Sequence, residues 1–151
     1  MKRNFRNTAK ITLALVYLVI IAGAVVRMTG SGMGCPDWPK CFGYYIPPTD
    51  ISQLQLQPEF TYKAGQVIIR KESLWVAKTD FITENNYNEV NWEPYQKHDY
   101  AVFNAFHTWI EFINRLFGSL AGIATLILAI ASFSFWWEDK KVTLISWLIV
   151  F

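Results

Sequence analysis

Three side chains that could do chemistry recur at helical spacing in one short stretch of the sequence. His107, Glu111 and Arg115 are separated by four residues each, so a helix would place all three on one face. An imidazole can ligate a metal, a carboxylate can move protons, and a guanidinium can bind carboxylates in a bidentate fashion. We therefore take this face as the candidate functional site and Glu111 as the candidate catalytic residue.

The elements that must position this face are predicted by long apolar runs. Residues 117–137 are 21 consecutive residues without a charge, and as a helix they would span about 31 Å, roughly a bilayer's hydrocarbon core. Ionisable groups at the mouth of such a span are costly to desolvate and so point to function. With 52% hydrophobic residues, the chain is predicted to be an all-α integral membrane protein. The complete transmembrane helices are expected at 9–28 and 107–137. Residues 142–151 would begin a third helix that is too short to cross, so we expect a fragment of a larger helical bundle.

The basic N-terminus predicts the orientation of these helices. Lys2, Arg3, Arg6 and Lys10 precede the first span without any acidic residue, and such a cluster favours the cytoplasmic side. Segments 1–8 and 138–141 are then cytoplasmic, and 29–106 is a long extracytoplasmic loop. The first run could instead be a signal-peptide core, but it is long for that role. No basic run follows the N-terminus, so nucleic acid is not an expected partner.

The extracytoplasmic loop holds both cysteines of the chain. Cys35 and Cys41 are close in sequence and would face an oxidising compartment, so we expect a disulfide. A structural bond, a redox-active pair, and free thiols remain open at this point. Runs at 66–70 and 73–77 are β-prone and predict a small hairpin, whereas 81–94 has the composition of a loop. Gly118 and Gly122, in the second span, have a spacing that permits close helix packing.

Two motifs resemble the haem A synthase (COX15/CtaA) family. The first is residues 27–41, Arg-Met-Thr-Gly-Ser-Gly-Met-Gly-Cys-Pro-Asp-Trp-Pro-Lys-Cys, which is similar to the signature after the first helix of that family. The second is Glu111-x-x-Asn114-Arg115, which is similar to the family's Glu-x-x-His-Arg motif at the mouth of the second helix. Family members have eight spanning helices in two similar halves, so the chain resembles the start of the N-terminal half.

The resemblance implies an oxidoreductase of a bacterial plasma membrane that crosses the membrane several times. It would oxidise the C8 methyl of haem O to the formyl group of haem A, for cytochrome oxidase. Haem O, the substrate, is expected in the N-terminal half, and a haem b cofactor in the C-terminal half that this chain lacks. Membrane lipid and haem O synthase are the other expected partners. The resemblance also implies that the cysteine pair forms a disulfide that assists haem transfer or electron flow.

One position departs from the family pattern. Asn114 stands where the family has a histidine, and an amide is a poor ligand for haem iron beside an imidazole. His107, two helical turns earlier and about 10 Å away along the axis, is the candidate for the axial iron ligand. Arg27 and Arg115 are candidates for pairing with haem propionates, and Asn114 would still line the haem site.

Simpler interpretations of these residues remain open. His107 would then be a solvated interfacial residue, Glu111 would support the helix through Arg115, and both arginines would be interface anchors. The competing function is a non-catalytic module for haem binding or oxidase assembly.

Overall fold

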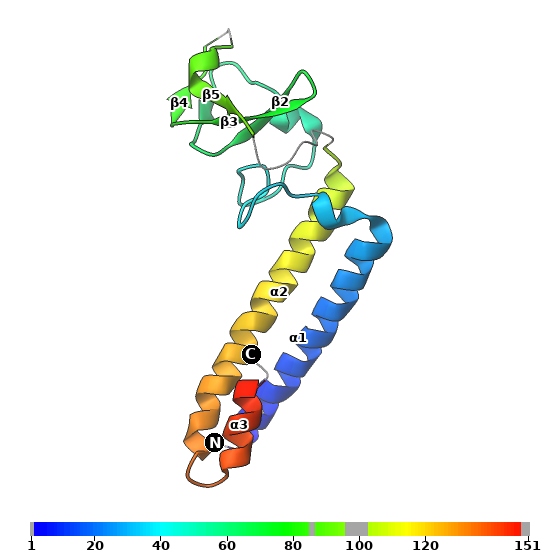
Figure 1. The fold of residues 1–151 in the computed structure, drawn as a ribbon, viewed down its shortest axis with the longest axis vertical. Coiled ribbons are helices and arrows are strands. Elements are labelled where there is room, and N and C mark those ends of the chain that lie inside the picture. Colours follow the sequence, from blue (N-terminus) through cyan, green and yellow to red (C-terminus); the bar gives the residue numbers. More distant parts are fainter. Residues whose placement is uncertain (1, 85–86, 96–102, 149–151) are drawn as a thin grey trace. The chain divides into compact units, whose positions relative to one another are not determined.

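The computed structural model describes residues 2–84, 87–95 and 103–148 (Figure 1). Parts of the predicted loop 29–106 and of the predicted third helix 142–151 lie outside the described residues. The chain divides into two compact units: Met1–Met28 with Ile113–Phe151, and Thr29–Phe112. We call these the helical unit and the loop unit, and describe each by itself.

The helical unit is made of three helices. They are α1 (Lys2–Thr29), α2 (Ala105–Ser132), whose first turns belong to the loop unit, and α3 (Lys140–Leu148). A short 3₁₀ turn, Phe133–Phe135, extends the end of α2. Arg3–Thr29 and Ala105–Phe135 are long and apolar enough to cross a membrane, so the prediction of two membrane-capable helices is confirmed. α1 begins seven residues before the expected start at residue 9, because Lys and Arg are good helix formers although they lower the hydropathy of that turn.

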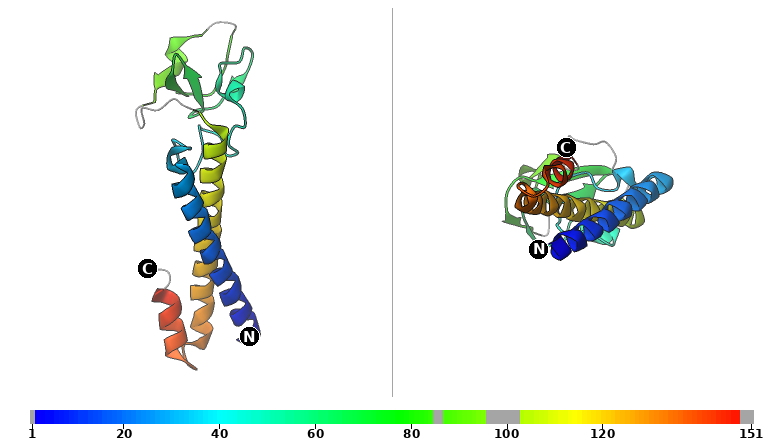
Figure 2. Two further views of the ribbon diagram at one scale, coloured as in Figure 1. Left: turned by 90° about the vertical axis from the view of Figure 1, so that its right-hand side faces the viewer. Right: turned by 90° about the horizontal axis from the view of Figure 1, so that it is seen from below.

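Within the helical unit α1 and α2 run antiparallel, and α1 crosses α2 at an angle in the left view of Figure 2. The rings of Phe5 and Phe135 lie 5.0 Å apart, and the Thr12 hydroxyl donates to the carbonyl oxygen of Ala124 over 3.4 Å. Gly23 faces the side-chain oxygen of Asn114, which a Cβ at Gly23 would meet at 3.9 Å. As residue numbers rise along α1, the numbers of their partners fall along α2, which fixes the antiparallel pairing.

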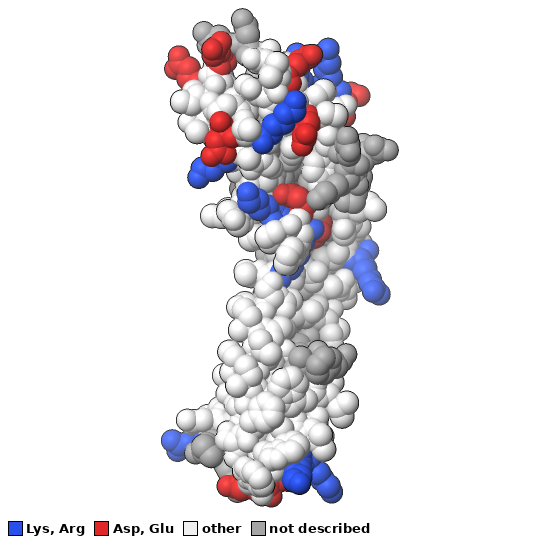
Figure 3. Space-filling view, turned by 60° about the vertical axis from the view of Figure 1, so that its left-hand side comes forward, with Lys and Arg blue, Asp and Glu red and all other residues white. Residues whose placement is uncertain are grey.

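The expected packing role of the Gly118 and Gly122 pair stays a prediction, because the described residues place no partner against either glycine. Both glycines are exposed, and a Cβ at either position would meet no heavy atom within 4 Å outside its own helix. The inward face of α2 is made instead by small or apolar residues that are buried: Ala121, Leu128, Ala129 and Ser132. In Figure 3 the middle of the helical unit shows no charged side chain, as a membrane-spanning surface requires.

A tight connection brings α3 back beside the end of α2. Asp139 accepts a hydrogen bond from the backbone N–H of Lys141 over 3.0 Å, which caps the new helix. The Thr143 hydroxyl then donates to the carbonyl oxygen of Ser132 over 2.8 Å. The helix begins at Lys140, two residues before the predicted start of the third span.

The loop unit contains strands, so the predicted all-α class describes only the helical unit. Strands β2 (Val67–Arg70), β3 (Ser73–Ala77) and β5 (Trp92–Pro94) form an antiparallel sheet in the order β2-β3-β5. Strands β1 (Thr61–Tyr62) and β4 (Phe81–Ile82) form a separate antiparallel pair. The interpretation of 81–94 as loop is therefore wrong, since it holds β4, β5 and a 3₁₀ turn, Glu89–Asn91.

β2 and β3 occupy the stretches expected to form a hairpin, and Arg70 pairs with Ser73. The two residues between them, Lys71 and Glu72, both have positive φ, at 50° and 60°. Two consecutive positive φ values are the mark of a type I′ turn, whose twist matches that of the flanking strands. The hairpin therefore closes through its turn geometry although neither turn residue is Gly or Asn.

The two faces of this sheet pack on different clusters. Val67 and Leu74 belong to a cluster that includes both cysteines, Phe42 and Leu54. Residues of the opposite face belong to an aromatic cluster made of Tyr62, Ile68, Ala77 and Trp92, with Trp75, Phe81 and Tyr87 beside it. This alternation is what the two-residue period of a strand requires. One face of the sheet therefore covers the loop that holds Cys35 and Cys41, which we call the cysteine loop.

Candidate functional site

The cysteine loop begins where α1 ends. Gly30 adopts φ 69°, a left-handed conformation that glycine takes without steric cost, and one 3₁₀ turn, Ser31–Met33, follows. Cys35 and Cys41 then form a disulfide with their Cα atoms 4.9 Å apart. The expected bond is therefore confirmed, and the alternative of free thiols does not apply to this structure.

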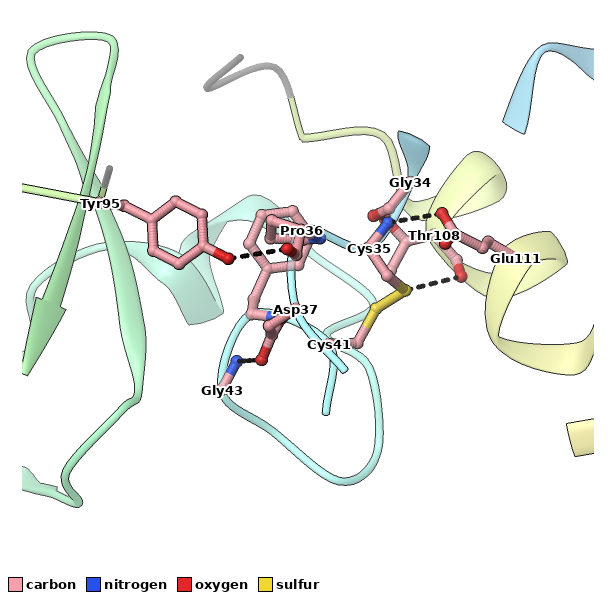
Figure 4. Close-up of a disulfide and its surroundings, with 10 residues drawn as sticks. Gly34, Cys35, Pro36, Asp37, Cys41, Gly43, Tyr95, Thr108 and Glu111 are labelled. Atoms are coloured by element: carbon pink, nitrogen blue, oxygen red, sulfur yellow. Dashed lines mark hydrogen bonds between the residues drawn. A yellow bond between two sulfur atoms is a disulfide. The ribbon is translucent and has the colours of Figure 1, made fainter. Parts of the chain in front are cut away.

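A carboxylate inside the loop holds its far end. The two oxygens of Asp37 accept hydrogen bonds from the backbone N–H groups of Phe42, over 2.5 Å, and Gly43, over 2.8 Å (Figure 4). The hydroxyl of Tyr95, just after β5, donates to the carbonyl oxygen of Pro36 over 2.7 Å. The loop is thus fixed both from within and from the β-sheet.

The disulfide is buried rather than exposed to solvent. Cys35 is 5% exposed and Cys41 is 1% exposed, and both belong to the cluster that packs under β2 and β3. A thiol that attacks a disulfide must reach one of the sulfur atoms. The burial therefore favours a structural role over thiol exchange in this conformation.

The first turns of α2 lie against the start of this loop, and two of their side chains bind it. Glu111 is 7% exposed and accepts a hydrogen bond from the backbone N–H of Cys35 over 2.8 Å. Thr108 is fully buried, and its hydroxyl donates to the carbonyl oxygen of Gly34 over 2.8 Å. Figure 4 shows both side chains pointing from the helix toward the loop.

His107 lies on the same turns but makes different contacts. Its backbone N–H donates to the side-chain oxygen of Asn104, which caps the helix, over 3.3 Å. Its ring is half-buried and lies 6.0 Å from the ring of Phe106. Within the described residues the imidazole nitrogens have no hydrogen-bond partner. No group of three metal-ligating side chains occurs among the described residues.

The other predicted site residues belong to the helical unit. Asn114 lies on α2 opposite Gly23 of α1, so its amide faces the neighbouring helix. Arg27 is exposed in the last turn of α1, and Arg115 is half-buried on α2. The structure thus brings Glu111 against the cysteine loop and Asn114 against α1, in two separate units.

Sequence reasoning missed Thr108 and the particular role of Gly34. Thr108 is uncharged and so does not stand out, although it lies three residues before Glu111 and therefore on the same helical face. Gly34 stands out in the sequence only as part of a flexible exit from the first helix. A Cβ at Gly34 would lie 2.5 Å from the carbonyl oxygen of His107, so only glycine allows this approach.

These features define a class of protein: a membrane protein in which a disulfide-bonded loop docks on the first turns of a spanning helix. Residues 6–85 match the family described as cytochrome oxidase assembly protein, COX15-CtaA. This match covers α1, the cysteine loop and most of the β-strands, which is more than half of the chain. The chain belongs to this family.

Individual relatives agree with that assignment. The chain is similar to heme A synthase of Shewanella oneidensis, with 47% identity over 45 residues, which cover 30% of this chain and 14% of that protein. It is similar to heme A synthase of Geobacillus thermodenitrificans, with 40% identity over 70 residues, or 46% of this chain and 22% of that protein. It is also similar to heme A synthase of Bacillus licheniformis, with 31% identity over 80 residues, which cover 52% of this chain and 26% of that protein.

The chain thus spans about a quarter or less of the length of these curated relatives. No solved structure matches it.

Proposed function

We propose that this chain is the N-terminal part of a haem A synthase, a membrane oxidoreductase that converts the C8 methyl of haem O to a formyl group. The observation that carries the proposal is the docking of the family's cysteine loop on Glu111. Relatives that share this region are named heme A synthases. Within the loop unit, Cys35 of the first family-like motif donates to Glu111 of the second.

Residue roles follow from the chemistry of each side chain. Glu111 is the candidate catalytic residue, because a carboxylate can handle protons. His107 offers an imidazole with no hydrogen-bond partner in the described residues, which would suit it to ligate the iron of the substrate haem. Arg27 and Arg115 are the candidates for binding the haem propionates, and Asn114 is the candidate for lining the haem site; these three residues belong to the helical unit.

The donor set of the described residues fits one haem. The described residues include a single imidazole, that of His107, and no cluster of three ligating side chains. By the family resemblance, this proposal assigns haem b, which supplies electron transfer through its iron when bound, to the C-terminal half of the full-length protein.

The proposal places the protein in a bacterial plasma membrane with its N-terminus in the cytoplasm. Lys2, Arg3, Arg6 and Lys10 support this orientation, because basic residues next to a first span remain on the cytoplasmic side. An impermeant maleimide applied to intact cells tests it. A cysteine introduced at Glu93 should be labelled and one introduced at Asn4 should not, and the opposite pattern would overturn the orientation.

The enzymatic proposal is tested by haem extraction. The full-length protein that carries this sequence is expressed in cells that make haem O but lack their own haem A synthase, and the extracted haems are separated by chromatography. The proposal expects haem A to appear at the expense of haem O. Purified protein that carries bound haem but forms no haem A would instead favour the non-catalytic module for haem binding or oxidase assembly.

A further inference from the structure

We propose that Thr108 and Glu111 act together as a clamp on a single peptide group, the one that joins Gly34 to Cys35, and that this clamp controls the reactivity of the disulfide. The carbonyl oxygen of this peptide belongs to Gly34 and accepts from the Thr108 hydroxyl over 2.8 Å. Its N–H belongs to Cys35 and donates to Glu111 over 2.8 Å. Both polar ends of the peptide are therefore bound by side chains three residues apart on α2. In this arrangement Thr108 and Glu111 are positioning residues.

The backbone approach at Gly34 makes the clamp possible. A Cβ at this position would meet the carbonyl oxygen and carbon of His107 at 2.5 and 2.6 Å, and the nitrogen of Thr108 at 2.7 Å. These are backbone atoms of a helix, which cannot move aside as a flexible side chain would. Glycine thus lets the loop come close enough for a short threonine hydroxyl to reach it.

The clamp acts directly on the disulfide because Cys35 is one of its two ends. The sulfur of Cys35 lies 3.6 Å from the carbonyl oxygen of Thr108, so α2 covers that sulfur. Cys41 is 1% exposed under the β-sheet. A reductant can therefore reach the bond only after the Gly34–Cys35 peptide has left Thr108 and Glu111. When that peptide leaves, a buried N–H and a buried C=O lose their partners, and this makes release costly.

This inference does not depend on haem A synthesis, because it concerns only the loop unit. The test measures how fast TCEP, a phosphine reductant, cleaves the Cys35–Cys41 bond in the purified full-length protein. TCEP attacks one sulfur, the S–S bond breaks, and after hydrolysis by water the products are two thiols and the phosphine oxide. The two cysteines are then counted by alkylation and mass spectrometry over time.

Two pairs of variants separate hydrogen bonding from shape. Thr108→Val and Glu111→Leu remove the donor and the acceptor while they keep similar volume, and each is expected to speed reduction about tenfold, which corresponds to about 1.4 kcal/mol. Thr108→Ser and Glu111→Gln keep a hydroxyl donor and an oxygen acceptor, and each is expected to stay within about twofold of the wild-type rate.

Thr83 supplies the matched control. It is also buried in the loop unit, and its hydroxyl is hydrogen-bonded to the backbone of Gln57 and Phe60, which precede β1 and lie outside the cysteine loop. Thr83→Val should therefore leave the rate unchanged. Reduction of Thr108→Val and Glu111→Leu at the wild-type rate would overturn the clamp. Equal acceleration in Thr83→Val would also overturn it, because the effect would then be general loosening of the unit.

Discussion

The helical unit and the loop unit differ in where their large apolar side chains lie. On α1, Ile11, Leu13 and Tyr17 are each more than half exposed. In the loop unit, by contrast, Leu54, Val67 and Ile68 are completely buried. The loop unit therefore has a core of its own, whereas the helical unit presents apolar surface that only lipid or further helices can cover.

The difference shows what each unit contributes. A helix supplies its own backbone hydrogen bonds and can therefore carry apolar side chains into a bilayer. The loop unit instead uses a β-sheet, a disulfide and a buried carboxylate to hold one short loop against the first turns of α2. Precise placement of that loop is thus the task of the loop unit, and the helical unit supplies the apolar surface suited to a membrane.

The largest effect is expected when the core of the loop unit is truncated. Leu54→Ala removes a fully buried side chain that packs in the cysteine-loop cluster, and it should lower stability by about 2–5 kcal/mol. The measurement is thermal or denaturant unfolding of the purified full-length protein, followed by trypsin resistance of the loop unit.

Leu13→Ala, at a position 58% exposed on α1, is the comparison variant for Leu54→Ala. It should cost far less, since its surroundings in the membrane remain apolar after truncation. An equal cost at Leu13 would show that this face of α1 is packed against protein in the intact molecule, and the contrast between the units would then fail.

A somewhat smaller effect is expected at the contact between the loop and α2. Gly34→Ala forces a methyl group against backbone atoms of His107 and Thr108, and overpacking of this kind typically costs about 1–3 kcal/mol. The same substitution at Gly118, an exposed helical position without neighbours within 4 Å among the described residues, should be neutral or slightly stabilising. Unfolding of the two variants side by side measures the difference, and equal stability would contradict the close approach.

The smallest effect concerns alkaline pH and is confined to the loop unit. Burial, and to a smaller extent the neighbouring Tyr62, raises the pKa of Tyr44 from 10.0 to about 12. The folded state therefore holds the phenolic proton more tightly than the unfolded state does. The resulting stability is fully present below about pH 10 and is lost as the pH rises toward 12. Tyr44→Phe should flatten the fall in stability between these pH values, and an unchanged slope would argue against this burial.

The sequence predicts the helices well because their signal is local. Long apolar runs identify both spans, and the hairpin at β2 and β3 lies in two adjacent β-prone runs. Strand pairs such as Thr61 with Ile82 join residues far apart in the chain, and no local pattern reveals them. For that reason the local composition of residues 81–94 predicts only a loop.

The sequence predicts which residues belong to the candidate site, but it does not predict how they are arranged in space. Side-chain chemistry singles out Glu111 and the cysteine pair, and helical spacing puts His107 near Glu111. Neither can show that Glu111 binds the backbone of Cys35, because that contact joins residues on two separate elements. Nor can they single out Thr108, whose hydroxyl becomes informative only once Gly34 lies against it.

The assignment of His107 as the iron ligand predicts which of two variants of the full-length protein forms less haem A. His107→Ala should reduce haem A formation more than Asn114→Ala, because an imidazole ligates iron and an amide does not. Haem A per unit of membrane protein is the measurement. The reverse order would mean that Asn114 occupies the working position and that His107 is a bystander.

The most direct test of the proposed function is the ratio of haem A to haem O in cells that express the full-length Glu111→Gln variant at the wild-type level. The glutamine oxygen can still accept from the N–H of Cys35, so an unchanged rate of disulfide reduction shows that the loop remains docked. A catalytic Glu111 predicts that the ratio falls on the order of 10²-fold or more, as is typical when an acid–base group is removed. A ratio close to that of the wild type would contradict the catalytic assignment and leave Glu111 with its positioning role alone.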